Sequence, residues 1–343
     1  MIFPVKNSRF RALRMSFLCL VLCALPLAAQ KKKDNLQKPM AGPRATALRV
    51  TWLYVSANLE SQKVGRVQIG REMVVAEKSG EWLRVYANTD IEEERSNDAP
   101  IFDTNDTPPP ISGWMQAKGV VIENTPNGDQ ILMGAAAEQE ALASDPRGPV
   151  NAARTAHLLY RRLVEMFPNS SLDAEAAWRA ADILWQIQKA DSATRPSAKE
   201  KEPYMREQMD EDGMKKVIKF YPGTKQAEFA AYELLDNKLC GDWQGQVKCP
   251  EKEAEIYEKY AAEHPDGART AQALYQAVYR EAVLTDMYAA DTNDKKSEAA
   301  HNRARELAAR LREKFPQSDY TARASILVFK LDQGIVVYGS DKE

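Results

Sequence analysis

The chain has 343 residues, enough for two or three domains, and its 44% hydrophobic and 28% charged residues are ordinary for a globular protein. This composition excludes a collagen-like chain, a bundle of membrane helices and a wholly disordered polymer. The formal net charge of −2 is close to balance and gives no reason to expect a nucleic-acid partner.

The first 29 residues have the pattern of a Sec-type secretory signal peptide. Four basic residues, the last of them Arg14, precede an apolar run from Met15 to Leu27 that ends at Ala28-Ala29-Gln30. Because the run is short for a membrane span, we expect cleavage near Ala29 rather than an uncleaved anchor. The mature chain would then have no transmembrane span and would be periplasmic or secreted. It would carry 43 Lys and Arg against 49 Asp and Glu.

Residues 30–45 are polar and aperiodic, which predicts a linker. From 46 to 122 the hydrophobic period changes to two, with β-branched and aromatic residues between turn signals. We expect short strands at 48–52, 64–67, 73–77, 82–86 and 113–115. Five short strands in so few residues predict a small all-β barrel.

Four features of this stretch carry a family resemblance: Lys63-Val64-Gly65, Gly70 before the next expected strand, the run from Gly80 to Val85 that contains Trp82, and Gly113-Trp114. With this spacing, residues 46–122 resemble a bacterial SH3-like (SH3b) domain. Two departures stand out. Tyr54-Val55-Ser56 replaces the Asn-Val-Arg run of the family, and an acidic, proline-rich insertion occupies about 88–112, where we expect extended or disordered chain.

The resemblance implies binding of cell-wall peptide or peptidoglycan, with Tyr54, Trp82 and Trp114 beside a groove. The residues themselves leave an alternative open. A barrel this small needs large side chains for its own packing, so Trp82 and Trp114 would then be core or interface residues.

Residues 123–148 predict a hinge with a short helix, since turn signals at 125–128 and 145–149 bound an alanine- and glutamate-rich segment. From 149 to 333 the period is helical. A short phrase of an aromatic residue or histidine, proline and a polar cap recurs four times in this stretch: Phe167-Pro168-Asn169-Ser170, Tyr221-Pro222-Gly223-Thr224, His264-Pro265-Asp266-Gly267 and Phe315-Pro316-Gln317-Ser318.

Each copy of this phrase should end one helix and begin another, because proline donates no amide hydrogen and the residue before it avoids helical geometry. The expected caps are Ser170 or Ser171, Thr224, and Ser318 or Asp319. Eight residues after each proline stands an alanine, which would let helices approach closely: Ala176, Ala230, Ala273 and Ala324. Ten residues after it stands a large apolar or aromatic residue: Trp178, Tyr232, Tyr275 and Ile326.

The prolines are 54, 43 and 51 residues apart, whereas regular tetratricopeptide repeats have a period of about 34. The extra length falls mainly at 190–203, 240–249 and 290–296. Residues 149–333 resemble the tetratricopeptide-like repeats of bacterial envelope proteins, including the outer-membrane assembly type. That resemblance implies a helical-hairpin solenoid that binds an envelope protein or peptide. The tail, 334–343, is expected to cap the last helix rather than to form a docking strand.

After cleavage two cysteines remain, Cys240 and Cys249, in a glycine-rich loop. In an oxidising compartment they predict a disulfide. A zinc site is the alternative, but the spacing is not Cys-x-x-Cys and no histidine flanks either cysteine.

No catalytic residues, cofactor or metal are predicted. His264 takes the place of an aromatic residue in its phrase, no free cysteine remains to act as a nucleophile, and the chain has neither a phosphate-binding glycine loop nor a His-Glu-x-x-His motif. We therefore expect a non-enzymatic, multidomain envelope adaptor, with a barrel for cell-wall or peptide binding and repeats for protein binding. The alternative is an accessory scaffold for outer-membrane protein assembly or transport, with a purely structural barrel.

Overall fold

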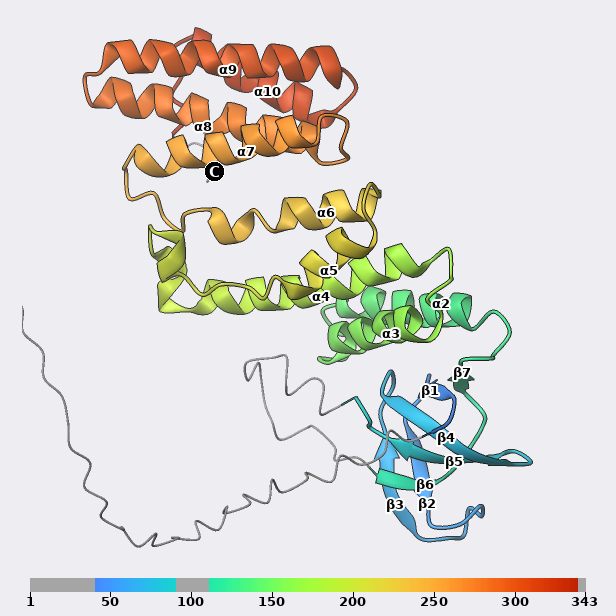
Figure 1. Ribbon diagram of the computed structural model, residues 1–343. Coiled ribbons are helices and arrows are strands. Elements are labelled where there is room, and N and C mark those ends of the chain that lie inside the picture. Colours follow the sequence, from blue (N-terminus) through green and yellow to red (C-terminus); the bar gives the residue numbers. More distant parts are fainter. Residues whose placement is uncertain (1–40, 91–110, 339–343) are drawn as a thin grey trace, which may run out of the picture. The chain divides into compact units, whose positions relative to one another are not determined.

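The computed structural model describes residues 41–90 and 111–338 (Figure 1). The predicted signal peptide, most of the linker and most of the insertion at 88–112 lie outside the described residues. In the described part, an antiparallel sheet is followed by helices.

Within the described residues the sheet has seven strands: β1 (Arg44–Ala47), β2 (Thr51–Tyr54), β3 (Lys63–Val67), β4 (Glu72–Ser79), β5 (Trp82–Ala87), β6 (Ile111–Gln116) and β7 (Val120–Ile122). Their order is β3-β2-β6-β5-β4-β1-β7, with antiparallel neighbours. The two end strands, β3 and β7, are not paired with each other, so the sheet is not closed. One face buries a core that includes Leu53, Met73, Leu83 and Met115.

Four of the five expected strands match β3, β4, β5 and β6, with longer bounds. The fifth, expected at 48–52, is wrong at its start because residues 48–50 form a bend between β1 and β2. The amide of Leu48 donates to the carbonyl oxygen of Gly119 at 2.9 Å, and its side chain packs in a cluster of Val121 and the first helices rather than in the main core of the sheet. The short strands β1 and β7 were not expected from the sequence.

The helices of the described residues are α2 (Gly128–Ala143), α3 (Ala152–Met166), α4 (Asp173–Thr194), α5 (Asp212–Phe220), α6 (Lys225–Glu233), α7 (Lys248–Glu263), α8 (Thr270–Ala290), α9 (Asp294–Lys314) and α10 (Asp319–Asp332). Short 3-10 turns lie between α4 and α5 and after α6. None of these helices combines the length and the apolar composition that a bilayer crossing requires.

All four phrase prolines lie between helices, as predicted, and define the hairpins α3–α4, α5–α6, α7–α8 and α9–α10. The rings before the prolines are half-buried. Phe167 packs against the cluster of α3, the Tyr221 hydroxyl donates to Asp173, and the His264 ring lies 4.6 Å from that of Tyr260. All four alanines are buried.

Two of the expected helix caps are confirmed. The side-chain oxygen of Thr224 accepts from the amide of Ala227, and that of Ser318 accepts from the amide of Tyr320. At α4 the expectation is wrong by position, because the residue before the helix is Leu172, which has no capping oxygen. Instead, the hydroxyl oxygen of Ser170 accepts from the amide of Leu172, the residue just before the helix.

The sheet is joined to α3 through Arg162, whose side chain is 0% exposed. Its guanidinium donates to the Gly70 carbonyl oxygen at 3.2 Å, to the Glu72 carboxylate at 2.8 Å and to the Asp90 carboxylate at 2.9 Å. Burial of a charge is costly unless it is paired and hydrogen-bonded, and here three groups from the sheet side satisfy one arginine. We call these residues, with Glu165 of α3, the Arg162 cluster.

Burial would raise the pKa of Glu72, but the hydrogen bond from Thr89 and the charges of Arg162 and Arg44 hold it below its ordinary value. The carboxylate therefore stays ionised beside Arg162 at neutral pH. Because its pKa is lowered by folding, this contribution to stability is present above the ordinary pKa and is lost as pH falls through the lowered one.

The last described segment closes α10. Gly334 has a φ of +68°. Its amide donates to the Leu331 carbonyl oxygen, and the amide of Ile335 donates to the Lys330 carbonyl oxygen. This is the Schellman pattern at a helix end. The chain then returns to α8, where Val337 is buried and its amide donates to Asp286 at 2.6 Å.

Candidate functional site

The candidate site lies on the face of the sheet opposite its core. In a strand, successive side chains point to opposite faces. Leu83 and Val85 of β5 and Met115 of β6 are fully buried in the core. The residues that alternate with them, among them Arg84 and Trp114, therefore project from the other face.

Four side chains form a row across this second face. In the sheet register Arg84 of β5 is paired with Trp114 of β6, Trp114 is paired with Tyr54 of β2, and Tyr54 is paired with Lys63 of β3. Directly paired residues have their Cβ atoms about 5 Å apart and interact. We call Arg84, Trp114, Tyr54 and Lys63 the aromatic row: two rings side by side, with a cation on each side of them. Arg84 is paired in turn with Glu77 of β4.

The three predicted site residues are brought together here. The rings of Tyr54 and Trp82 meet edge to face, with 5.8 Å between their centroids. Tyr54 is only 9% exposed, whereas Trp82 and Trp114 are half-buried. Tyr54 is thus largely a packing residue, and the two tryptophans are the rings that a ligand can reach.

The sequence reasoning missed three residues of this face: Trp52, Lys63 and Arg84. Trp52 is 44% exposed, and the Lys63 ammonium lies 4.7 Å from its ring centroid in a cation–π contact. The available signal was strand alternation. Trp52 stands two residues before Tyr54, and Arg84 two residues after Trp82, so each shares a face with its predicted neighbour.

The chemistry of this face is that of binding. Flat rings stack on sugars and peptide groups, and Lys63 and Arg84 suit carboxylates. Across the residues the structure describes, no group of three or more His, Cys, Asp and Glu side chains is arranged to hold a metal ion.

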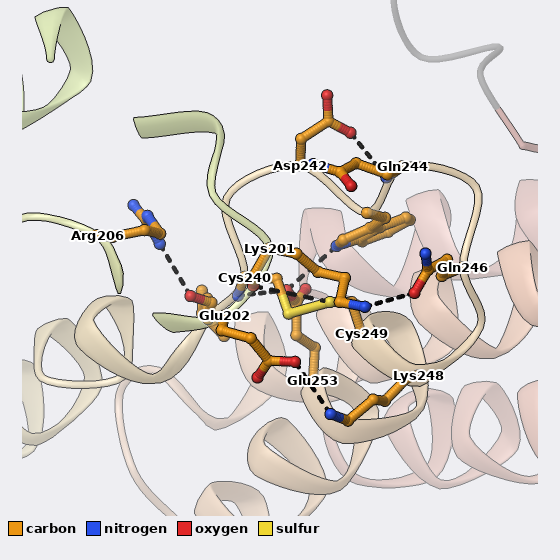
Figure 2. Close-up of a disulfide and its surroundings, with 12 residues drawn as sticks. Lys201, Glu202, Arg206, Cys240, Asp242, Gln244, Gln246, Lys248, Cys249 and Glu253 are labelled. Carbon is orange, nitrogen blue, oxygen red and sulfur yellow. Dashed lines mark hydrogen bonds and ion pairs between the residues drawn. A yellow bond between two sulfur atoms is a disulfide. The ribbon is translucent and has the colours of Figure 1, made fainter. Parts of the chain in front are cut away.

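A second region with many polar contacts surrounds the two cysteines. Cys240 and Cys249 form the predicted disulfide, with their Cα atoms 6.0 Å apart. Figure 2 shows the loop that this bond closes, above α7. The Glu253 carboxylate, 2% exposed, accepts from the Cys240 amide at 3.0 Å and from the Trp243 indole at 3.2 Å. It also accepts from Arg280 of α8 at 3.0 Å.

The same loop is tied to the segment between α4 and α5. Lys248 donates to Glu202 at 3.0 Å (Figure 2), and the Gly241 amide donates to the Glu200 carbonyl oxygen at 3.1 Å. The disulfide therefore fixes the place where two of the three predicted insertions meet. These contacts hold the loop to α8 and to the segment between α4 and α5.

Two half-buried carboxylates of the repeats titrate near neutrality. Burial, with the negative charges of Asp236 and Asp182, raises the pKa of Glu233 to about 7. Burial, with the charge of Glu258, likewise raises the pKa of Glu281 to about 7. Glu233 lies on α6 and Glu281 on α8, in different hairpins, and we assign them no chemistry.

Comparison with known protein families gives no match to this sequence, and comparison with curated proteins gives none either.

Proposed function

We propose that this chain is a non-enzymatic, exported adaptor of the bacterial cell envelope. In this proposal the sheet is an SH3-like module whose aromatic row binds a carboxylate-bearing cell-wall peptide or peptidoglycan. The helical hairpins are tetratricopeptide-like repeats that hold an envelope protein or peptide. The observation that carries the proposal is the aromatic row, with Arg84 and Lys63 at its two ends.

This face supports the ligand class because its aromatic rings and its two cations match different parts of such a ligand. The half-buried ring of Trp114 in the row, and that of Trp82, which contacts Tyr54 edge to face, offer flat apolar surface at a low cost in side-chain entropy. The two cations provide charge-assisted hydrogen bonds, which are about twice as strong as neutral ones. Wall peptides joined to sugar rings present both features together.

Location outside the cytoplasm is supported by two observations. The N-terminal pattern of basic residues, apolar run and small residues is that of an export signal. The disulfide between Cys240 and Cys249 is the kind of bond that persists in an oxidising compartment.

The test is sedimentation of the purified chain with insoluble peptidoglycan. We expect the wild-type protein to be retained and W114A to bind about tenfold more weakly, a loss of about 1.4 kcal/mol in binding free energy. The charge reversal K63E/R84E should lose retention as well. K78E/K118E makes the same charge change at two other exposed lysines, one in β4 and one in the turn between β6 and β7, and should be retained like the wild type.

A second candidate function is favoured by the Arg162 cluster. A sheet joined to α3 by a fully buried arginine has a structural task of its own, as the first layer of the helical array. The chain would then be a scaffold for outer-membrane protein assembly or transport. Absence of wild-type retention on peptidoglycan, with the fold intact by circular dichroism, would favour this second function over the first.

A further inference from the structure

The two sides of the aromatic row differ in charge. On the β5 side, Arg84 is paired with Glu77 of β4. Opposite charges in directly paired positions of a sheet attract each other. The Glu77 carboxylate therefore offsets part of the Arg84 charge, so this side of the row attracts a ligand carboxylate less than a lone cation would.

On the β3 side two cations stand together without an acidic residue opposite them. β3 is an end strand of the sheet, and its Lys63 and Arg66 are both exposed. The residues paired with them on β2 are aromatic, since Tyr54 is opposite Lys63 and Trp52 is opposite Arg66. Within the part of the chain that the structure describes, neither cation forms an ion pair with a carboxylate. The positive charge of this side is thus uncompensated.

Trp52 is the neighbour that these two cations share. Its ring is 44% exposed, and the Lys63 ammonium lies 4.7 Å from the ring centroid. Arg66 occupies the directly paired position, where Cβ atoms are about 5 Å apart. A lysine ammonium has three donors, so Lys63 can contact the ring and still donate to a ligand. Flat apolar surface and two sets of charged donors therefore lie next to each other.

A single carboxylate has to bind on one side of the row or the other. In the sheet order, β3 and β5 are separated by three steps of about 4.8 Å, so roughly 14 Å lies between the backbones of Lys63 and Arg84. The rings of Tyr54 and Trp114 occupy the positions between them. Charge complementarity then favours the β3 side, which has two cations and no opposing carboxylate.

We propose that the carboxylate of the bound wall peptide lies at Lys63 and Arg66, with the adjoining part of the ligand on the Trp52 ring. The remainder of the ligand extends over Trp114 toward Arg84. This inference rests on the proposed function, to which it adds Trp52 and Arg66 as binding residues and a fixed direction of the ligand across the strands.

Sedimentation of the full chain with two preparations of insoluble peptidoglycan tests the proposal. One preparation is native, and in the other the carboxylates have been converted to neutral amides with carbodiimide and ammonia. We expect the wild type to bind the amidated preparation about tenfold more weakly than the native one. An exposed ion pair contributes up to about fivefold in affinity, so K63A/R66A should bind native peptidoglycan about tenfold more weakly than the wild type. This variant should no longer distinguish the two preparations.

Three further variants sharpen the test. R84A should keep the wild-type preference for native peptidoglycan, because its cation does not bind the carboxylate. K63Q/R66Q keeps long polar side chains at the two positions without their charges and should behave like K63A/R66A. The matched control K78A/K118A removes two charges at exposed lysines outside the row and should bind like the wild type. Since all these side chains are exposed, circular dichroism should show the same fold for every variant.

The outcomes separate this inference from the proposed function. A wild type that is retained equally on the two preparations overturns the inference and leaves the proposed function standing. A preference for native peptidoglycan that R84A abolishes and K63A/R66A keeps overturns it as well, because the carboxylate then binds on the β5 side. Absence of wild-type retention on native peptidoglycan overturns the proposed function, and the inference with it.

Discussion

The two ends of the helical array are built from the same kind of hairpin and are finished in opposite ways. At the first hairpin, α3 meets the sheet through the buried guanidinium of Arg162 and its carboxylate partners. At the last hairpin, α10 leaves Ile326 and Phe329 half-exposed. A polar cluster fixes one arrangement, because each donor needs its own acceptor. An apolar face fixes no single arrangement, because burial of apolar surface is not directional.

The largest effect on stability should come from removing the side chain at the centre of the Arg162 cluster. R162A removes the guanidinium and leaves the Glu72 and Asp90 carboxylates buried without it, so we expect a loss of about 3 to 5 kcal/mol in the free energy of unfolding. Urea titration measures this loss. R161A is the matched control from the neighbouring position, where an ion pair with Glu165 should contribute under about 1 kcal/mol. Equal losses for the two variants would contradict the role given to Arg162.

Removing the disulfide in the middle of the helical array should destabilise the protein less than removing Arg162. C240S/C249S opens a loop whose ends are 9 residues apart, and the chain-entropy account gives a loss of about 2 to 3 kcal/mol. The Glu253 contacts should loosen with it, so the fluorescence of Trp243 should change as well. The control is dithiothreitol, which should destabilise the wild type and leave C240S/C249S unchanged. A wild type that reductant does not destabilise would contradict this assignment.

A feature shared by the hairpins should have a smaller effect. T224A removes the side-chain oxygen that accepts from the Ala227 amide, and loss of such a cap costs about 1 kcal/mol. S171A is the control, since Ser171 is a candidate cap that the structure does not use, and its melting temperature should not move. If S171A were the more destabilised variant in thermal unfolding, the placement of the helix starts would be wrong.

The remaining effect is a dependence on pH. Glu233 and Glu281 have pKa values raised to about 7, so folding favours their protonated forms. The stability they contribute is complete below the ordinary carboxyl pKa and is lost as pH rises through about 7. E233Q/E281Q should therefore melt higher than the wild type at pH 8 and at nearly the same temperature at pH 4. A gain of equal size at both pH values would contradict the raised pKa values.

The helical hairpins could be predicted because their signals are local. A proline such as Pro222 ends a helix wherever it stands, and an alanine such as Ala230 repeats in a fixed relation to it. The disulfide was predicted because only two cysteines, Cys240 and Cys249, lie outside the predicted signal peptide. The strands were predicted where alternation ran for several residues, as from Trp82 onward. Strands as short as β7 offer too few residues to show a period.

The Arg162 cluster could not be predicted, because nothing local distinguishes Arg162 from Arg161. Only the fold, which brings Glu72 and Asp90 to it from 90 and 72 positions away, decides which of the two is buried. The aromatic row was predicted in part for a similar reason. Aromatic residues draw attention in a sequence, whereas Arg84 and Lys63 gain their meaning from strand pairing.

Hydrogen–deuterium exchange of the wild type and R162A tests the contrast between the two ends most directly. We expect R162A to speed exchange in peptides from α3, which lose the contacts of the Arg162 cluster, and to leave exchange in peptides from α10 unchanged. Exchange in α3 that is the same in the two proteins, or exchange in α10 that speeds up by the same factor, would contradict the role given to the Arg162 cluster.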